Sequence, residues 1–348
     1  VINDNDLKKW QTFMRIWGWY DQHFTWDPEL EEHLLRSSIR AFALHPDGPL
    51  PPVLCQGAKK RLADLQAELD KLNQSSAWKK LNFEDFIEKL LNIYYKFNNI
   101  EGIAISLPGK IDSITGFSYS GGSLFYNNEK NIPKFLSSKL GIPVTAENDG
   151  KCAALAEAWQ GNLSDCNDGI VVILGTGVGG GIIKSKQVHR GKEFIAGEFS
   201  FIINNTNAKK GEKLNLFGFT GGVPTGLCRP VANIKGISET KVDGKKVFQW
   251  ANEGDSDVLE ILDNYCYSLA LNLHNLQHIY NPEKIAIGGG ISSQNILFEY
   301  LQKNIDYLQN NFIHNFPPLS KPNIVKCQFR NDANLIGALY HYMTLNPQ

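Results

Sequence analysis

The sequence predicts an α/β protein, and three observations support this fold class. From residue 79 onward, short apolar runs alternate with longer segments of helical periodicity. Three of these runs end in a glycine turn, as in "AISLPG", "VVILG" and "IAIGGG". Because ligands of open α/β sheets bind beyond the carboxyl ends of the strands, these turns are candidate sites.

Residues 1–78 differ from the rest of the chain, and we expect them to form a helical segment of unknown role. Four of the seven tryptophans lie within residues 10–26. One helix is predicted over 27–44, because Asp27 suits its N-cap, and a second over 57–72, where leucines recur on one face. The segment is interpreted as a packing or oligomerisation element. Carbohydrate-binding tryptophans are an alternative without other support.

The remaining chain is expected to alternate regularly between helices and strands. Helices are predicted over 82–97, 131–140, 149–161, 257–280 and 332–343. Strands are predicted over 102–109, 142–147, 171–174, 284–287 and 323–329. The pair Asp243-Gly244 predicts a turn.

The stretch "VVILGTGVGGGII" holds five glycines between Gly175 and Gly181, although glycine weakens a strand. Gly175, Gly177 and Gly180 match the dinucleotide-binding pattern G-x-G-x-x-G, which needs a helix directly afterwards. The chain instead continues without helical periodicity as far as Gly191, so a β-hairpin fits better. Three interpretations stay open: a hairpin that holds phosphate on backbone N–H groups, a purely structural hairpin and a dinucleotide site.

The stretch "TAENDGKCAALAEAW" places Glu147, Asn148 and Asp149 where a strand passes into a helix. Asn and Asp at such a position cap the free N–H groups of the first helical turn. A carboxylate held there can also take a proton from a substrate hydroxyl, while a neighbouring Asn holds other hydroxyls. The two roles are compatible with each other.

Composition excludes several classes of protein. The chain has 348 residues, a net charge of −1 and a pI of about 6.8, which gives no basic bias toward nucleic acid or anionic membranes. No apolar stretch approaches the ~20 residues of a membrane span. The six cysteines form no C-x-x-C pair, which argues against zinc knuckles and disulfides and for a cytoplasmic location.

His274 and His278 lie four residues apart on the long predicted helix, a spacing that suits a metal ion. No third ligand is evident nearby in the sequence. Packing or surface exposure is therefore the favoured interpretation, and we predict no metal site.

Six stretches together resemble the ROK family of sugar kinases and sugar-responsive repressors: "SLPGKID", "ENDGKCAALAEAW", "VVILGTGVGGGII", "AGEFSF", "NPEKIAIGGGI" and "NDANLIGAL". Their order and spacing match from about residue 83 to the end of the chain. The resemblance implies a two-lobed actin/hexokinase-like (ribonuclease H-like) fold. It implies a small lobe of residues 79–168 and 331–348, and a large lobe of residues 169–330.

The resemblance also assigns roles to single residues. It implies that Asp149 is the catalytic base and that Asn148 and Glu198 bind sugar hydroxyls. The pair Gly121-Gly122 fits a bare turn but resembles the sugar loop of the family. The nucleotide would contact Gly175, Thr176, Gly177, Gly288, Gly289 and Gly290. The implied cofactors are ATP and Mg²⁺, and the partner is a sugar or glucoside. The sequence leaves the oligomeric state open, and a homodimer is one of the open states.

One departure from the family concerns zinc. The family usually has Gly-His after "AGE-x", where the His contacts sugar and binds zinc, but Phe201 stands there in this chain. The cysteine-rich loop that usually follows corresponds to "NLFGFTGGVP", which has no cysteine. A zinc site needs its full ligand set, so we expect no structural zinc. The "GEFSF" segment is similar to that of zinc-free β-glucoside kinases, which favours a glucoside substrate.

A second departure lies in residues 1–78. Kinases of this family begin with a strand–turn–strand that carries an Asp and a Gly-Gly-Thr phosphate loop, and no D-x-G-G-T occurs here. We therefore expect these strands and this loop to be missing. Phosphoryl transfer depends on positioning and charge stabilisation, so the loss predicts weak activity.

The predicted function is ATP-dependent phosphorylation of a hexose or β-glucoside hydroxyl. The alternative is a non-catalytic sugar-binding pseudokinase or a sugar-responsive regulator. A DNA-binding repressor is disfavoured, because residues 1–78 hold nine Lys and Arg against eleven Asp and Glu.

Overall fold

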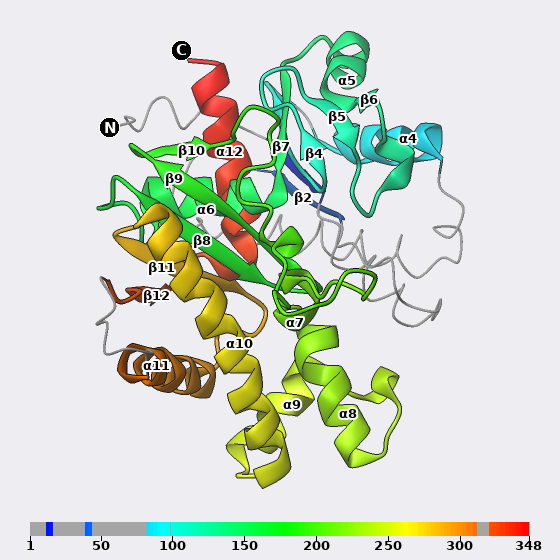
Figure 1. Cartoon of the computed structure of the whole chain (residues 1–348). Coiled ribbons are helices and arrows are strands. Elements are labelled where there is room, and N and C mark those ends of the chain that lie inside the picture. The colour runs from blue at the N-terminus through cyan, green and yellow to red at the C-terminus, as the bar shows by residue number, and fades with distance from the viewer. Residues whose placement is uncertain (1–11, 17–38, 44–81, 98, 312–319, 348) are drawn as a thin grey trace. The chain divides into compact units, whose positions relative to one another are not determined.

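The computed structural model describes residues 12–16, 39–43, 82–97, 99–311 and 320–347 (Figure 1). The chain divides into two compact units. The first unit combines Val1–Gln160, Gly191–Ile195 and Asp332–Gln348, and the second combines Gly161–Arg190 with Ala196–Asn331. Each unit packs helices against a mixed sheet, which confirms the predicted α/β class.

The main sheet of the first unit has the strand order β2-β1-β3-β7. Its strands are β1 (Thr12–Ile16), β2 (Ile39–Ala43), β3 (Ile103–Leu107) and β7 (Val144–Asn148). Strands β1 and β2 are antiparallel, whereas β1, β3 and β7 run parallel. Strands β3 and β7 are buried along their whole length, and their carboxyl ends meet where Leu107 pairs with Asn148.

The prediction of an all-helical N-terminal segment is wrong for the two stretches that the structure describes. Residues 39–43, which we assigned to the end of a helix, form β2, and β1 pairs with both β2 and β3. Pairing with a buried strand outweighs local helical propensity, which is a weak prior. The N-terminal strands that we expected to be missing are therefore present. The tryptophans of residues 10–26 and the predicted helix over 57–72 lie outside the described residues.

The described residues of the first unit also form the helices α4 (Phe83–Tyr94), α5 (Ile132–Leu140), α6 (Asp149–Gln160) and α12 (Ala333–Leu345). Helix α4 begins with a capping box, in which Asn82 and Asp85 bond each other's backbone N–H. The backbones of helices α6 and α12 are in contact at Gly337. Only glycine fits there, because a Cβ would overlap the carbonyl group of Cys152. A small antiparallel sheet follows β3 and consists of β4 (Lys110–Ile111), β5 (Phe117–Ser120) and β6 (Lys130–Asn131).

The sheet of the second unit has the order β10-β9-β8-β11-β12. Its strands are β8 (Gly169–Leu174), β9 (Val178–Lys184), β10 (Gln187–His189), β11 (Lys284–Gly289) and β12 (Ile324–Lys326). Strands β8, β9 and β10 are joined by antiparallel pairing, whereas β8, β11 and β12 run parallel. The pairing of Leu174 with Val178 confirms the hairpin that we predicted at the glycine-rich stretch.

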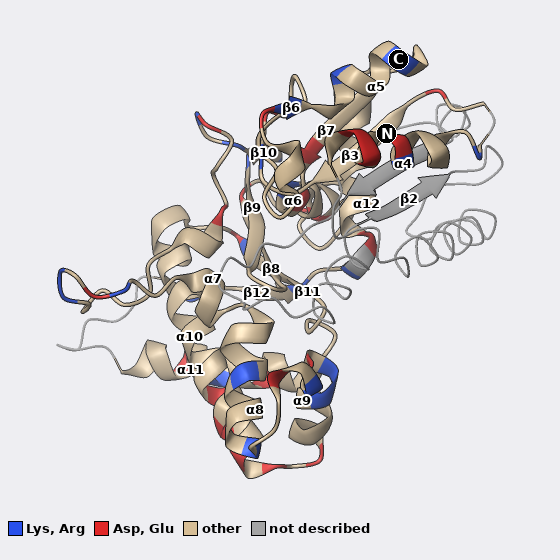
Figure 2. Ribbon diagram, turned by 90° about the vertical axis from the view of Figure 1, so that its right-hand side faces the viewer, with Lys and Arg blue, Asp and Glu red and all other residues tan. Residues whose placement is uncertain are grey.

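The helices of the second unit are α7 (Phe217–Thr220), α8 (Arg229–Lys235), α9 (Gly244–Asn252), α10 (Ser256–Tyr280) and α11 (Asn295–Asn310). The side chain of Asp255 caps α10, and α11 packs alongside it (Figure 1). Around α8 and α9, Figure 2 shows Lys and Arg interspersed with Asp and Glu, as in the ion pair of Arg229 with Glu239 at 2.8 Å. None of the helices in the described part of the chain is long and apolar enough to cross a membrane.

Candidate active site

The β7–α6 junction carries the three polar residues that the sequence singled out. Glu147 and Asn148 end β7, and Asp149 begins α6. The Asn148 side chain caps the helix, since its Oδ1 accepts the N–H of Lys151 at 3.1 Å. Its Nδ2 donates to the carbonyl oxygen of Gly109 at 2.9 Å. One buried amide therefore holds the start of α6 to the turn after β3.

Asp149 is oriented by its own helix. Its Oδ1 accepts the N–H of Gly150 at 2.8 Å, and the residue is only partly buried. The first turn of a helix favours negative charge, because its N–H groups point toward that end. A carboxylate at this position is suited to act as a general base, provided that a substrate hydroxyl lies within hydrogen-bond reach.

Two glycine turns meet beside this junction. Gly109 and Gly122 both have left-handed backbones, with φ of +92° and +56°. A Cβ on Gly109 would lie 2.5 Å from the backbone nitrogen of Gly122, so the two backbones touch. The buried Gly121 donates its N–H to Oδ1 of Asn128 at 2.7 Å. Because Gly109 also accepts from Asn148, the structure brings the predicted glycine pair to the β7–α6 junction.

A distant segment contributes to the same unit through residues 191–195. Lys110 Nζ lies 3.0 Å from Oε2 of Glu193 and 5.2 Å from the centroid of the Tyr119 ring. The rings of Tyr119 and Phe194 are nearly parallel, with 20° between their planes and 6.3 Å between their centroids. Sequence reasoning assigned no role to these four residues, because their contacts join segments far apart in the chain.

In the second unit, residues 175–177 form the turn of the β8–β9 hairpin. Gly175 is fixed by two backbone bonds: its N–H donates to Gly177 at 3.0 Å, and its carbonyl accepts from Val223 at 2.7 Å. No backbone carbonyl group of the described residues accepts the N–H of Thr176 or Gly177. Successive backbone donors at a tight turn bind anions, so this turn fits a phosphate group.

Other glycines of the hairpin are explained by packing. A Cβ on Gly180 would lie 2.6 Å from Cε2 of Phe199, and a Cβ on Gly197 would lie 3.0 Å from Cα of Gly181. These close contacts hold Gly197 and Phe199, the two neighbours of Glu198, against β9. Because a strand rather than a helix follows the turn, the dinucleotide interpretation is excluded. The glycine-rich stretch therefore combines structural glycines with a turn suited to phosphate.

The last predicted glycine group ends β11. A Cβ on Gly289, which has φ of +99°, would overlap the carbonyl group of Leu174, so only glycine fits beside the end of β8. Gly288 is buried and pairs with Ile173. Around Gly290, none of the described atoms lies within 4 Å of the place that a Cβ would take. The backbone is therefore tightly packed at Gly289 and exposed at Gly290.

Among the described residues, no group of three or more His, Cys, Asp or Glu side chains is arranged to hold a metal ion. Phe201 is 69% exposed at the end of a short 3₁₀ turn. The rings of His274 and His278 lie 4.2 Å apart, and Nδ1 of His278 donates to the carbonyl oxygen of His274 at 2.9 Å. Burial, aided by the charge of His278, lowers the pKa of His274.

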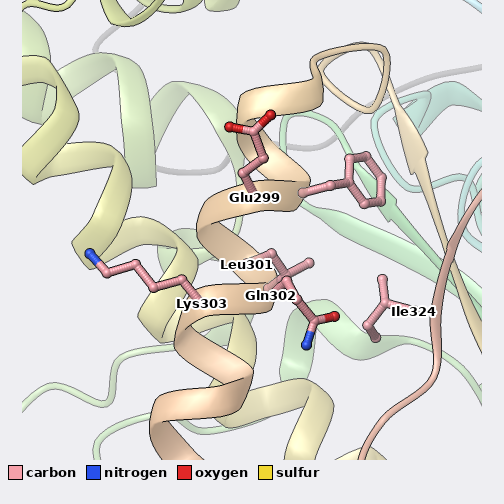
Figure 3. A pocket seen from close by; sticks show the side chains of 6 residues that line it. Glu299, Leu301, Gln302, Lys303 and Ile324 are labelled. Carbon is pink, nitrogen blue, oxygen red and sulfur yellow. The ribbon is translucent and has the colours of Figure 1, made fainter.

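A separate hollow of about 530 Å³ lies between α11 and β12 (Figure 3). Figure 3 shows Leu301 and Gln302 on the side of α11 that faces Ile324, whereas Glu299 and Lys303 point elsewhere. The hollow contains none of the predicted site residues. The predicted site residues lie in both units. The first unit contains Asn148, Asp149 and Gly121-Gly122, and the second contains Glu198 and the glycine groups at residues 175–177 and 288–290.

Comparison with known proteins identifies relatives of the chain. Residues 71–344 match the ROK family. The chain is 30% identical over 246 residues to the beta-glucoside kinase of Listeria monocytogenes, over 70% of this chain and 80% of that protein.

Two solved structures share the fold. The ROK family protein of Streptococcus pneumoniae in complex with sucrose has a TM-score of 0.70 at 24% identity, over 96% of this chain and 98% of that one. The ROK family glucokinase of Streptomyces griseus in complex with glucose and AMPPNP has a TM-score of 0.61 at 18% identity, over 94% and 97% of the two chains. The fold is therefore actin/hexokinase-like, as the resemblance implied.

Proposed function

The chain belongs to the ROK family, and from this premise we propose that it uses ATP to phosphorylate a hydroxyl of a hexose or a β-glucoside. The observation that carries the proposal is the β7–α6 junction. There Asp149 begins the helix while Asn148 binds both the helix and the Gly109 turn. A carboxylate held in this way suits proton removal from a hydroxyl.

In the proposed reaction, the sugar lies against the first unit with one hydroxyl at Asp149. Asn148 and the Gly121-Gly122 backbone bind its other hydroxyls. Asp149 takes the proton while the hydroxyl oxygen attacks the γ-phosphorus of ATP in line. The bond from that phosphorus to the bridging oxygen of ADP breaks, and ADP and the sugar phosphate leave. The proton on Asp149 then passes to water.

The nucleotide is proposed to bind at the glycine groups of the second unit. The N–H groups of Thr176 and Gly177 donate to phosphate oxygens, where backbone donors stabilise the developing charge. The open space at Gly290 suits the adenosine. Mg²⁺ bound with ATP would supply further charge neutralisation.

A β-glucoside is the favoured substrate within this class, and no structural zinc is proposed. The Listeria monocytogenes relative, which is 30% identical to this chain, is a beta-glucoside kinase. Phe201 takes the place of the zinc-binding His, and residues 215–224 contain no cysteine. Elemental analysis of purified protein is expected to find far less than one zinc per chain. A tightly bound equivalent of zinc would contradict this part of the proposal.

A sugar binder without catalysis is the second candidate, and one observation favours it. Strands β1 and β2 are present, but the 17–38 stretch between them has Gly18 as its single glycine and no D-x-G-G-T. The γ-phosphate would then lack half of its backbone donors. We therefore propose a slow kinase rather than an inactive protein, because Asp149 and the 175–177 turn are retained.

The test is a rate measurement on the full chain with ATP, Mg²⁺ and a panel of glucose, cellobiose and N-acetylglucosamine. ADP release and the sugar phosphate are both measured, and sugar binding is followed by calorimetry. The proposal predicts a sugar phosphate from glucose or cellobiose at a rate below that of the Listeria monocytogenes kinase. Sugar binding without any sugar phosphate would instead establish the non-catalytic binder.

A further inference from the structure

A pair of aromatic rings, one exposed and one half-buried, lies on the first unit next to the turns proposed to bind sugar. Tyr119 comes from β5 and Phe194 from the 191–195 segment, and their rings are nearly parallel at 6.3 Å between centroids. Tyr119 is 49% exposed. The exposed part of the Tyr119 ring is therefore accessible to a ligand.

The ring pair is tied directly to the β7–α6 junction. Gly109 accepts the Asn148 amide at 2.9 Å, and the next residue, Lys110, places its Nζ 5.2 Å from the Tyr119 centroid. The other side of the Gly109 turn touches Gly122, which follows β5 by two residues. Asn148 is thus linked to the Tyr119 ring through the Gly109 carbonyl group and the Lys110 side chain.

The rings are braced in place. Phe117 meets Tyr119 edge-on, with 5.0 Å between centroids and 74° between planes. Glu193 pairs with Lys110 at 3.0 Å, which links the segment that carries Phe194 to the turn after β3. Phe194 itself has φ of +62°, a left-handed backbone that bulky residues rarely adopt and that persists only where the surroundings impose it.

Such a surface has the chemistry that recognises a flat, partly apolar ring with hydroxyls at its edge. The face of an aromatic ring is negative, so it attracts the C–H groups of a sugar face or the edge of another aromatic ring. The lysine ammonium and the Glu193 carboxylate can bond hydroxyls at the rim. A β-linked glucoside offers both features, because its axial hydrogens form apolar faces and its hydroxyls point outward.

We propose that Tyr119 and Phe194 bind the aglycone of a β-glucoside, meaning the second sugar or aryl group, while the glucose ring lies at Asn148 and Asp149. This inference rests on the proposed function and deepens it, since it names the residues that select a glucoside over a free hexose. The alternative is that the ring pair only clamps the 191–195 segment.

Calorimetry with the full chain separates these possibilities without requiring turnover. The probes are cellobiose, phenyl β-glucoside and glucose. The ring contact predicts that both glucosides bind more tightly than glucose. It predicts that Tyr119→Ala weakens glucoside binding about tenfold more than glucose binding, which is the scale of one aromatic contact. Tyr119→Phe should restore most of the difference, because it keeps the ring face.

Tyr95→Ala is the matched control, since Tyr95 is a 64% exposed tyrosine of the same unit at the end of α4. It should leave the ratio of glucoside to glucose affinity unchanged. The proposal is overturned if glucosides bind no more tightly than glucose, or if Tyr119→Ala and Phe194→Leu weaken all three probes equally. A failed proposed function is seen separately, as an absence of sugar phosphate with every sugar.

Discussion

Nδ2 of Asn148 donates to the carbonyl oxygen of Gly109 across 2.9 Å, and this bond joins the ends of two neighbouring parallel strands. The same amide accepts the N–H of Lys151 through its Oδ1. Asn148 is thus both the helix cap and the link to the Gly109 turn. The capping interpretation and the substrate interpretation of the sequence are compatible in this geometry.

Two substitutions at Asn148 separate its two bonds. Asn148→Asp keeps an oxygen for the Lys151 N–H but loses the donor to Gly109 and sets a carboxylate against a carbonyl oxygen. Asn148→Ala loses both bonds, and the lost cap costs about 1 kcal/mol of unfolding free energy. We expect calorimetry to show weaker sugar binding for both variants. In urea denaturation, only Asn148→Ala should lose the free energy of unfolding that the helix cap contributes. Wild-type sugar affinity in Asn148→Asp would contradict a role for the Gly109 link.

We predict that the glycines of β9 differ in how much free energy of unfolding is lost when each is replaced by alanine. Gly180→Ala brings a methyl group against the carbonyl oxygen of Val171 and the Phe199 ring, and costs about 1–3 kcal/mol of unfolding free energy by overpacking. Gly179→Ala is the matched control, because its Cβ would meet nothing nearer than Cβ of Ile173 at 4.0 Å. The control should stay within about 0.5 kcal/mol of wild type. Equal losses in urea denaturation would refute the packing explanation.

His274 is expected to make stability fall in mild acid. Burial, and then the charge of His278, lower its pKa in the folded protein below the ordinary value of 6.5. The unfolded chain therefore binds the proton more tightly, so stability is fully present above pH 6.5 and declines as the pH falls below it. Thermal unfolding midpoints between pH 7.5 and 5.5 (a range set by the ordinary His pKa of about 6.5) should drop less in His274→Gln than in wild type.

His189→Gln serves as the control for this pH effect. His189 is exposed on β10 and belongs to the same unit. Its removal should leave the wild-type slope in place. If wild type and His274→Gln have the same pH slope, the contribution assigned to the His274 pair is absent.

Local patterns predicted the parts of the fold that local chemistry determines. The hairpin at Gly175–Gly181 followed from the missing helical periodicity, and the β7–α6 junction followed from Asn and Asp after an apolar run. Strand β2 was missed because Asp27 and the apolar spacing of residues 29–44 also fit a helix. Its strand conformation depends on β1, which in turn depends on the buried strand β3.

For the site residues too, contacts between distant parts of the chain could not be predicted from local patterns. Gly109 accepts the Asn148 amide although nothing in "SLPGKID" indicates a partner 39 residues away. Tyr119 and Phe194 meet only because the 191–195 segment joins the first unit. Contacts of this kind follow from the tertiary arrangement, so no window of sequence contains them.

The central claim is that Asp149 removes the proton in a sugar kinase reaction. It is tested most directly by the rate of sugar phosphate formation from ATP and cellobiose in wild type, Asp149→Asn and Asp165→Asn. Asp165 is the control, because its side chain is 68% exposed and pairs with Lys284 in the second unit. We predict that Asp149→Asn still binds sugar but loses at least about a hundredfold in rate, as expected for a missing general base, whereas Asp165→Asn keeps the wild-type rate. Wild-type turnover in Asp149→Asn would contradict the account.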